Sequence, residues 1–292
     1  NGNGAKDYID AGDGNDTIII DSTAEHASGE QIHGGLGNDT IELTASTTLT
    51  TTDASITGVE EITAGGTAAV TFIGLGQTEN FIFNDNTGIS TITMGKGAHT
   101  IKLSAADGAD DIIIEEQGGG INTVTGFEVG ASKDIIRLDL SELENAARLA
   151  TGITIDFVEI HDNNSVAAAD GGVQVVTGGV QAADAKNVFY LDMGATKYAD
   201  AAAAVDAIEL GGAAALTFAG NVAAEDGFIL GYENNNSTAG VTLAAVYFIA
   251  GDNNGGGAAA TAVGNLGAVD LVTLEGVTDI STLNANNLAF IA

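Results

Sequence analysis

The chain has 292 residues, and its 40 Asp and Glu residues against 8 Lys and Arg residues give a net charge of −32. Such a charge repels phosphate, so it excludes nucleic acid as a natural partner, and it argues equally against binding to anionic membranes. No run of about 18 apolar residues is present, so we expect no membrane insertion. Because 45% of the residues are hydrophobic, the chain is expected to fold, and its few aromatic residues favour thin β-structure over a large globular core.

The first part of the chain follows a nine-residue frame, Gly-Gly-x-Gly-x-Asp-x-apolar-x. Residues 34–42 (GGLGNDTIE) fill the frame completely, residues 11–19 (AGDGNDTII) fill it apart from Ala11, and residues 2–10 (GNGAKDYID) fill it loosely. Glycine reaches the positive φ angles of a tight turn, while Asp and the bared turn carbonyls supply hard oxygen ligands that suit Ca²⁺. The frame therefore predicts the nonapeptides of a parallel β-roll, with one turn and one short strand in each repeat.

The spacing of the acids sharpens this prediction. Asp7, Asp16, Glu30 and Asp39 stand at or near the Asp place with gaps of 9, 14 and 9 residues. Successive turns of a roll fall on opposite edges, so acids two repeats apart should share an edge and bracket one row of ions. A 5-residue bulge between positions 21 and 29 would make both edge pairs, Asp7 with Glu30 and Asp16 with Asp39, 23 residues apart. A flexible acidic linker would not keep the apolar residues in period.

Residues 43–143 continue as short β-branched or aromatic runs ended by Gly, Asn or Asp, which is typical of strands. A second set of repeats occupies residues 95–125, where His99, Asp110 and Asn122 stand at the Asp place of three successive repeats. Asp110, helped by Asp107, is the credible Ca²⁺ ligand of this set, although an unoccupied turn is nearly as well supported. We interpret His99 as a solvated turn residue, because the four histidines show no zinc spacing.

The remainder of the chain is richer in alanine and has longer elements. Residues 126–143 predict a closing strand that runs into a helix with Ser141 as its N-cap. Residues 196–210 predict one convincing helix capped by Thr196, among strands that suit an antiparallel β-meander. We therefore expect a mainly β chain of two domains: a β-roll and β-solenoid over residues 1–143, and a C-terminal β-rich module with one short helix over residues 144–292.

The nonapeptides resemble those of RTX (repeats-in-toxin) proteins, which Gram-negative bacteria export by type I secretion. The order DGNDTIIIDS, an inserted loop, GGLGNDTIEL and then ITGVEEITA resembles RTX-type surface-layer proteins. The GFILGYE and VYFIAGD segments, followed by LVTLEGVTDISTL, resemble their terminal module, which carries the secretion signal. Because Asn1 falls within a repeat, the chain resembles the C-terminal part of such a protein.

This resemblance implies Ca²⁺ as the cofactor, the type I secretion machinery as a partner, and an extracellular or bacterial cell-surface location. It also implies Ca²⁺ roles for the residues at matching motif positions, although Ala11, Glu30, His99 and Asn122 depart from the pattern and should shorten the ion row. With the neighbouring acids, the candidate metal-site residues are Asp7, Gly12, Asp13, Gly14, Asn15, Asp16, Glu30, Gly34, Gly35, Gly37, Asn38, Asp39, Asp107 and Asp110.

The expected function is structural: a Ca²⁺-dependent secreted protein that assembles with copies of itself into a layer or filament. The alternatives are the folding and secretion module of a hydrolase whose catalytic domain lies upstream, or an RTX adhesin. No HExxH motif, GxSxG motif or cysteine is present, and the acid pairs Glu60/Glu61 and Glu115/Glu116 should lie on exposed strand faces, so we expect no enzyme. An adhesin would need a ligand pocket, for which the sequence offers no aromatic cluster.

Overall fold

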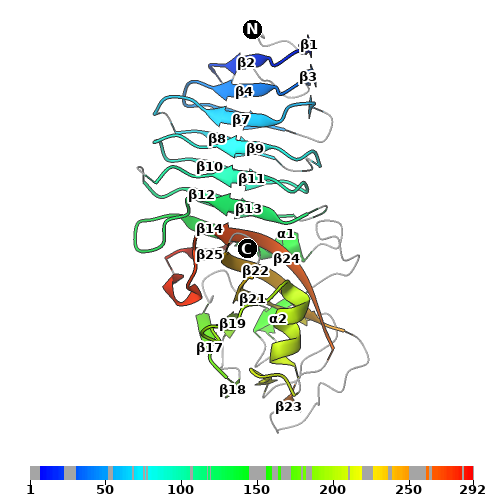
Figure 1. Ribbon diagram of the computed structural model, residues 1–292, viewed down its shortest axis with the longest axis vertical. Coiled ribbons are helices and arrows are strands. Elements are labelled where there is room, and N and C mark those ends of the chain that lie inside the picture. The colour runs from blue at the N-terminus through cyan, green and yellow to red at the C-terminus, as the bar shows by residue number, and fades with distance from the viewer. Residues whose placement is uncertain are drawn as a thin grey trace. The chain divides into compact units, whose positions relative to one another are not determined.

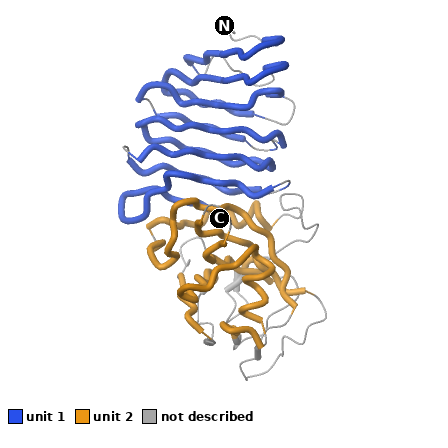
Figure 2. Tube along the Cα trace, viewed as in Figure 1, with its two compact units in different colours: residues 1–137 blue, residues 138–292 orange. Residues whose placement is uncertain are grey.

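The chain is mainly β-structure, as expected, and falls into two compact units, residues 1–137 and residues 138–292 (Figure 2). The computed structural model describes residues 7–22, 31–51, 55–67, 69–74, 76, 78–105, 108–116, 118, 120–144, 156–159, 164–165, 172–178, 180–181, 186–209, 211–218, 226–235, 239–249, 261–262, 265–284 and 286–291. No helix in these residues is long and apolar enough to cross a membrane.

Unit 1 consists of short strands that follow one another along the chain. They are β1 (Tyr8–Asp13), β2 (Thr17–Ile20), β3 (Gln31–Leu36), β4 (Thr40–Leu43), β5 (Thr48–Thr50), β6 (Ile56–Thr57), β7 (Glu61–Ala64), β8 (Thr71–Ile73), β9 (Ile82–Asn84), β10 (Thr91–Met94), β11 (Thr100–Lys102), β12 (Asp111–Ile114), β13 (Asn122–Thr125) and β14 (Ile135–Asp139), the last of which runs on into unit 2.

These strands form three stacks, in the orders β1-β3-β6, β2-β4-β7-β9-β11-β13 and β5-β8-β10-β12-β14 (Figure 1). The chain passes from one stack to another after each strand, so it coils, and each strand hydrogen-bonds to the strand one coil later. The pairs from β1 to β13 are parallel. Tyr8 lies opposite Gln31 and Thr17 lies opposite Thr40, which confirms the 23-residue offset that the acid spacing predicts.

Side chains alternate between outward and inward along each strand, and the inward side chains fill the interior of the coil. In β4, Ile41 and Leu43 are fully buried while Thr40 and Glu42 face outward, as the period of two in a strand requires. The strand register stacks Ile41 in line with further buried apolar side chains, one from each coil. The members of this column are Ile41, Ile62, Phe83, Ile101 and Val124.

Unit 2 combines longer strands with helices. Its elements are α1 (Leu140–Leu143), β15 (Asp156–Glu159), β16 (Asn164–Ser165), β17 (Gly172–Val176), β18 (Val180–Gln181), β19 (Lys186–Leu191), α2 (Ala201–Ile208), β20 (Leu216–Phe218), β21 (Asp226–Glu233), β22 (Gly240–Phe248), β23 (Thr261–Ala262), β24 (Leu266–Glu275), a 3₁₀ helix (Ile280–Thr282) and β25 (Leu288–Ile291). Its described residues thus hold two α-helices, α1 near the helix predicted from Ser141 and α2 within the helix predicted over residues 196–210.

Among the described strands of unit 2, the predicted antiparallel meander is found in β21, β22 and β24, and β15 with β16 and β20 with β23 form two separate antiparallel pairs. Strands β17, β19 and β21 pair in parallel, because the chain between β19 and β21 carries α2 and returns to the same end of the sheet. The inner face of α2 packs into a core that includes Val205, Ile208, Phe189 and Phe228.

Both predicted helix caps are wrong. Helix α2 begins after Asp200, whose carboxylate accepts the amide of Ala203 at 2.9 Å, rather than at Thr196. Helix α1 begins after Asp139, which accepts the amide of Glu142 at 3.1 Å. Ser141, the predicted cap, instead lies inside α1. An Asp immediately before the first helical turn competes successfully because its carboxylate also complements the helix dipole.

Candidate calcium-binding turns

Glycines with positive φ turn the chain at the end of β1 and just after it, and again at the end of β3 and just after it. The φ angles are +98° at Gly12, +122° at Gly14, +113° at Gly35 and +139° at Gly37. L-residues with a Cβ rarely adopt such angles, so these positions require glycine. The frame identified in the sequence therefore corresponds to two similar turns, one coil apart.

Oxygen atoms occupy the space that glycine side chains would fill. A Cβ on Gly35 would lie 1.9 Å from the carbonyl oxygen of Gly12, and a Cβ on Gly37 would lie 2.0 Å from that of Gly14. A Cβ on Gly34 would meet the carbonyl oxygen of Gly58 at 1.9 Å and Oδ2 of Asp39 at 2.8 Å. Glycine thus allows successive turns to stack closely, with a carbonyl oxygen of one coil against a glycine of the next coil.

The carboxylates of the repeats form a column beside these turns. The amide of Asp16 donates to Oδ1 of Asp39 at 2.8 Å, and the amide of Asp39 donates to Oε2 of Glu60 at 2.8 Å. Asp39 is fully buried. Glu60 comes directly before β7, just as Asp39 comes before β4, but the blurred period in this region concealed its equivalence.

In two of these carboxylates, the second oxygen makes no hydrogen bond. Oδ2 of Asp16 and Oδ2 of Asp39 are buried and have no hydrogen-bond partner. A buried carboxylate oxygen without a partner is costly, and a bound cation would satisfy it. Together with the stacked turn carbonyls, these atoms fit the all-oxygen ligand set of Ca²⁺.

Side chains alone do not complete such a site. Within the described part of the chain, no three His, Asp or Glu side chains converge closely enough to hold a metal ion. Calcium takes 6 to 8 oxygen ligands and accepts backbone carbonyls among them. The residues that fit the ion are therefore Asp16 and Asp39 with the carbonyls of the glycine turns.

The other predicted residues of this region play smaller parts. Oδ1 of Asn15 accepts the amide of Asn38 at 3.1 Å, which ties the two turns together. The carbonyl of Asp7 accepts the amide of Gln31 at 3.0 Å, and Asp13 is exposed at the end of β1. Glu30 and Asp107 lie outside the described residues.

Asp110 belongs to a second column, which precedes β10, β12 and β14. Oδ1 of Asp110 accepts the amide of Ser90 at 2.7 Å, and Oδ1 of Asp134 accepts the amide of Asp110 at 3.1 Å. Oδ2 of Asp134 also accepts the amide of Glu128 at 2.7 Å, and burial raises the pKa of Asp134 above its ordinary value. The structure therefore does not bring Asp110 to the Asp16 and Asp39 turns. Asp134 was missed because no glycine pair precedes it.

The interpretation of His99 as a solvated turn residue is wrong. The register places Phe81, His99 and Asn122 in the same column as Asp39 and Glu60, further along the coil. The His99 ring is fully buried, and it lies against Phe81 with 3.9 Å between ring centroids. Its amide donates to Oδ1 of Asn122 at 3.1 Å. Along the coil, the side chains of this column are therefore first acidic (Asp39 and Glu60), then aromatic (Phe81 and His99), and finally an amide (Asn122).

The acid pairs Glu60/Glu61 and Glu115/Glu116, expected on exposed strand faces, also make contacts within the coil. Glu116 is fully buried and accepts the amide of Gly76. Oε1 of Glu61 accepts from the amide group of Asn84 in the neighbouring strand. These carboxylates serve as hydrogen-bond acceptors between coils.

In comparisons with known proteins, no family model, no curated protein and no solved structure matches the chain.

Proposed function

We propose that the turns around Asp16 and Asp39 bind Ca²⁺, and that the chain is a calcium-dependent structural protein of the RTX β-roll type. The observation that carries this proposal is the pair of buried, unpartnered Oδ2 atoms in coils whose glycine turns stack so closely that the carbonyl oxygens of Gly12 and Gly14 lie against Gly35 and Gly37. The 23-residue register supports it, because it places the two carboxylates one coil apart in one column.

Calcium would act by linkage between ion binding and folding. A net charge of −32 opposes compaction, so the chain stays loose where Ca²⁺ is scarce and suits export by the type I secretion machinery. Extracellular Ca²⁺ modules bind with Kd values of about 10⁻⁴ to 10⁻³ M, near the concentrations outside cells. The turns hardly exist in the unfolded chain, so the binding free energy becomes folding free energy.

Assembly at the bacterial cell surface is the second part of the proposal. Exposed acids such as Asp13 give neighbouring copies groups that Ca²⁺ can bridge. The same ion then converts repulsion between acidic copies into attraction, which favours a homo-oligomeric layer or filament.

The test is a Ca²⁺ titration of the purified chain from chelator to about 10 mM, with Mg²⁺ as the control ion. Far-UV circular dichroism follows folding, while light scattering and negative-stain microscopy follow assembly. Ordered sheets or fibres that form with Ca²⁺ and not with Mg²⁺ support both parts. A chain that folds with Ca²⁺ but stays monomeric refutes the assembly and leaves a folding module. A chain with no Ca²⁺ response refutes the ion sites.

A further inference from the structure

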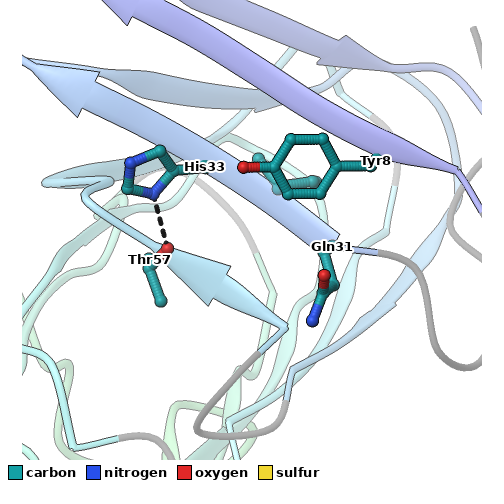
Figure 3. Close-up of a pocket in the computed structure, with 5 residues that line it drawn as sticks. Tyr8, Gln31, His33 and Thr57 are labelled. Carbon is teal, nitrogen blue, oxygen red and sulfur yellow. Dashed lines mark hydrogen bonds between the residues drawn. The ribbon is translucent and has the colours of Figure 1, made fainter.

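The outer face of β1, β3 and β6 holds a pocket of about 150 Å³, lined by Tyr8, Gln31, Ile32, His33 and Thr57 (Figure 3). The register explains its composition. Tyr8 lies opposite Gln31, and His33 lies opposite Thr57, so two columns of outward side chains meet across three coils. The five lining residues include neither Asp16, nor Asp39, nor a glycine of the turns, so none of them is a ligand in the proposed ion sites.

Tyr8 is unusual in this chain. Its side chain is 64% exposed, and it is the only exposed aromatic residue among the aromatic side chains that the structure describes. Tyrosine offers a rigid, flat contact surface with a polar end and loses little conformational entropy on binding, which makes it common at recognition sites. An exposed tyrosine beside a pocket therefore points to a ligand with a flat apolar side.

The polar groups around Tyr8 are held in place. Nδ1 of His33 and Oγ1 of Thr57 are hydrogen-bonded at 2.7 Å, which fixes the orientation of the imidazole ring. Figure 3 shows the Tyr8 hydroxyl directed toward the side of the pocket on which His33 lies. A few convergent polar groups beside an apolar surface are the ordinary composition of a small-molecule site.

The charge and size of the pocket narrow the ligand class. None of its five lining residues is an acid or a lysine or arginine, and the net charge of −32 repels anions. Its volume is below the range of about 300 to 1,000 Å³ of drug-sized sites, so it suits one small ring. A pyranose has an apolar C–H face for an aromatic ring and a rim of hydroxyls for imidazole, amide and hydroxyl groups. We propose that this pocket binds an uncharged pyranose sugar, with Tyr8 stacked on the ring.

The affinity of a single site should be low. A ligand of about twelve non-hydrogen atoms at ordinary ligand efficiency has a Kd on the order of 1 mM. Saturation-transfer difference NMR detects binding in this range. The probes are the methyl pyranosides of glucose, galactose, mannose and N-acetylglucosamine, each at about 10 mM, with methyl glucuronide as the anionic comparison.

The variants separate stacking from folding. Tyr8→Ala should lower the affinity for the best neutral probe about tenfold, and Tyr8→Phe should keep most of it because the ring remains. Ile19→Ala is the matched control, since Ile19 is also a large exposed side chain, 55% accessible, but lies on β2 outside the pocket. Circular dichroism in the presence of Ca²⁺ verifies that every variant is folded.

Loss of the signal in Tyr8→Ala with retention in Tyr8→Phe and Ile19→Ala supports the site. Three outcomes overturn it: no neutral pyranoside shows transfer to the folded wild-type chain, Tyr8→Ala binds as the wild type does, or glucuronide binds as strongly as the neutral probes. Because folding is verified separately, a negative result here leaves the calcium proposal untouched.

Discussion

The backbone amide of Asp16 donates to the Oδ1 atom of Asp39, one coil later, at 2.8 Å. This bond makes Asp39 a cap for the neighbouring coil. Asp39 is also a candidate ion ligand, so it has two roles. The two roles use different oxygens, because Oδ2 of Asp39 is buried without a hydrogen-bond partner. They can therefore be separated by substitution.

We expect Asp39→Asn and Asp39→Ala both to raise the Ca²⁺ midpoint of folding, since each removes a negative ligand. Only Asp39→Ala also leaves the Asp16 amide without its acceptor, which costs about 1 to 3 kcal/mol. Urea unfolding at saturating Ca²⁺ should show this additional loss in the alanine variant. Asp10→Asn, which removes an exposed charge of β1 that is not among the candidate ligands, is the control. Equal stability of the two Asp39 variants would contradict the capping role.

The glycine turns offer a second test. Gly12 and Gly35 both have positive φ, but a Cβ on Gly12 meets nothing within 4 Å, whereas a Cβ on Gly35 would lie 1.9 Å from the Gly12 carbonyl. Gly12→Ala should therefore cost only the conformational term of about 1 to 2 kcal/mol. Gly35→Ala should cost clearly more, because it also separates the coils. Urea midpoints at saturating Ca²⁺ measure the difference, and a Gly35→Ala variant as stable as Gly12→Ala would refute the close stacking.

The aromatic pair of Phe81 and His99 is expected to stabilise the coil independently of calcium. Phe81→Ala removes a buried ring and should lower the free energy of unfolding by about 3 to 5 kcal/mol. Ile89→Ala, at a residue 55% exposed, should change it by less than about 0.5 kcal/mol. Denaturation at several Ca²⁺ concentrations should give a constant loss for Phe81→Ala. A loss that disappears at high Ca²⁺ would contradict a calcium-independent role.

Because Asp200, and not Thr196, caps α2, substitutions at these two positions should have different effects on the stability of unit 2. Asp200→Ala should destabilise unit 2 by about 1 kcal/mol, because the amide of Ala203 loses its acceptor. Thr196→Ala should be nearly neutral, because Thr196 is exposed and lies outside the helix. Thermal unfolding of the two variants distinguishes the positions, and a larger effect at Thr196 would restore the original prediction.

The buried carboxyl of Asp270 should make the stability of the folded chain depend on pH. Burial raises its pKa above the ordinary value of 3.8, against the opposing hydrogen bonds from the Tyr232 hydroxyl and the Ala201 amide. At pH values between 3.8 and the raised pKa of Asp270, this carboxyl is protonated more often in the folded chain than in the unfolded chain. The contribution of Asp270 to stability is therefore present below 3.8 and is lost as pH rises through its folded pKa. Asp270→Asn should lose less stability than the wild type over this interval.

Asp279 provides the control of opposite sign. Hydrogen bonds from Ser281 lower the pKa of this exposed carboxyl below 3.8, so its contribution is present above 3.8 and is lost as pH falls through the lowered pKa. Urea midpoints from about pH 3 to pH 7 for the wild type, Asp270→Asn and Asp279→Asn should separate the two effects. Parallel profiles for the wild type and Asp270→Asn would contradict the buried role of Asp270.

The local sequence was enough to predict the mainly β architecture, the glycine turns and the offset between coils. The reason is that these features depend on short-range rules. Gly12 and Gly35 mark positions that only glycine adopts without strain, and Ile41 continues a strict alternation of apolar side chains. The spacing from Asp16 to Asp39 then sets the register once turns are assumed to repeat.

Only the tertiary structure decided which group each side chain meets. His99 is buried because Phe81 lies in the preceding coil, Asp110 is paired with Asp134 rather than with the glycine turns, and Tyr8 meets Gln31 and His33 in one pocket. Hydrogen bonds between coils join residues 18 positions apart at Ala98 and Asn80, 24 apart at Asp110 and Asp134, and 40 apart at Gly76 and Glu116. Pairings at such separations depend on loop lengths and on competition among many candidate partners, and no local pattern of residues records their outcome.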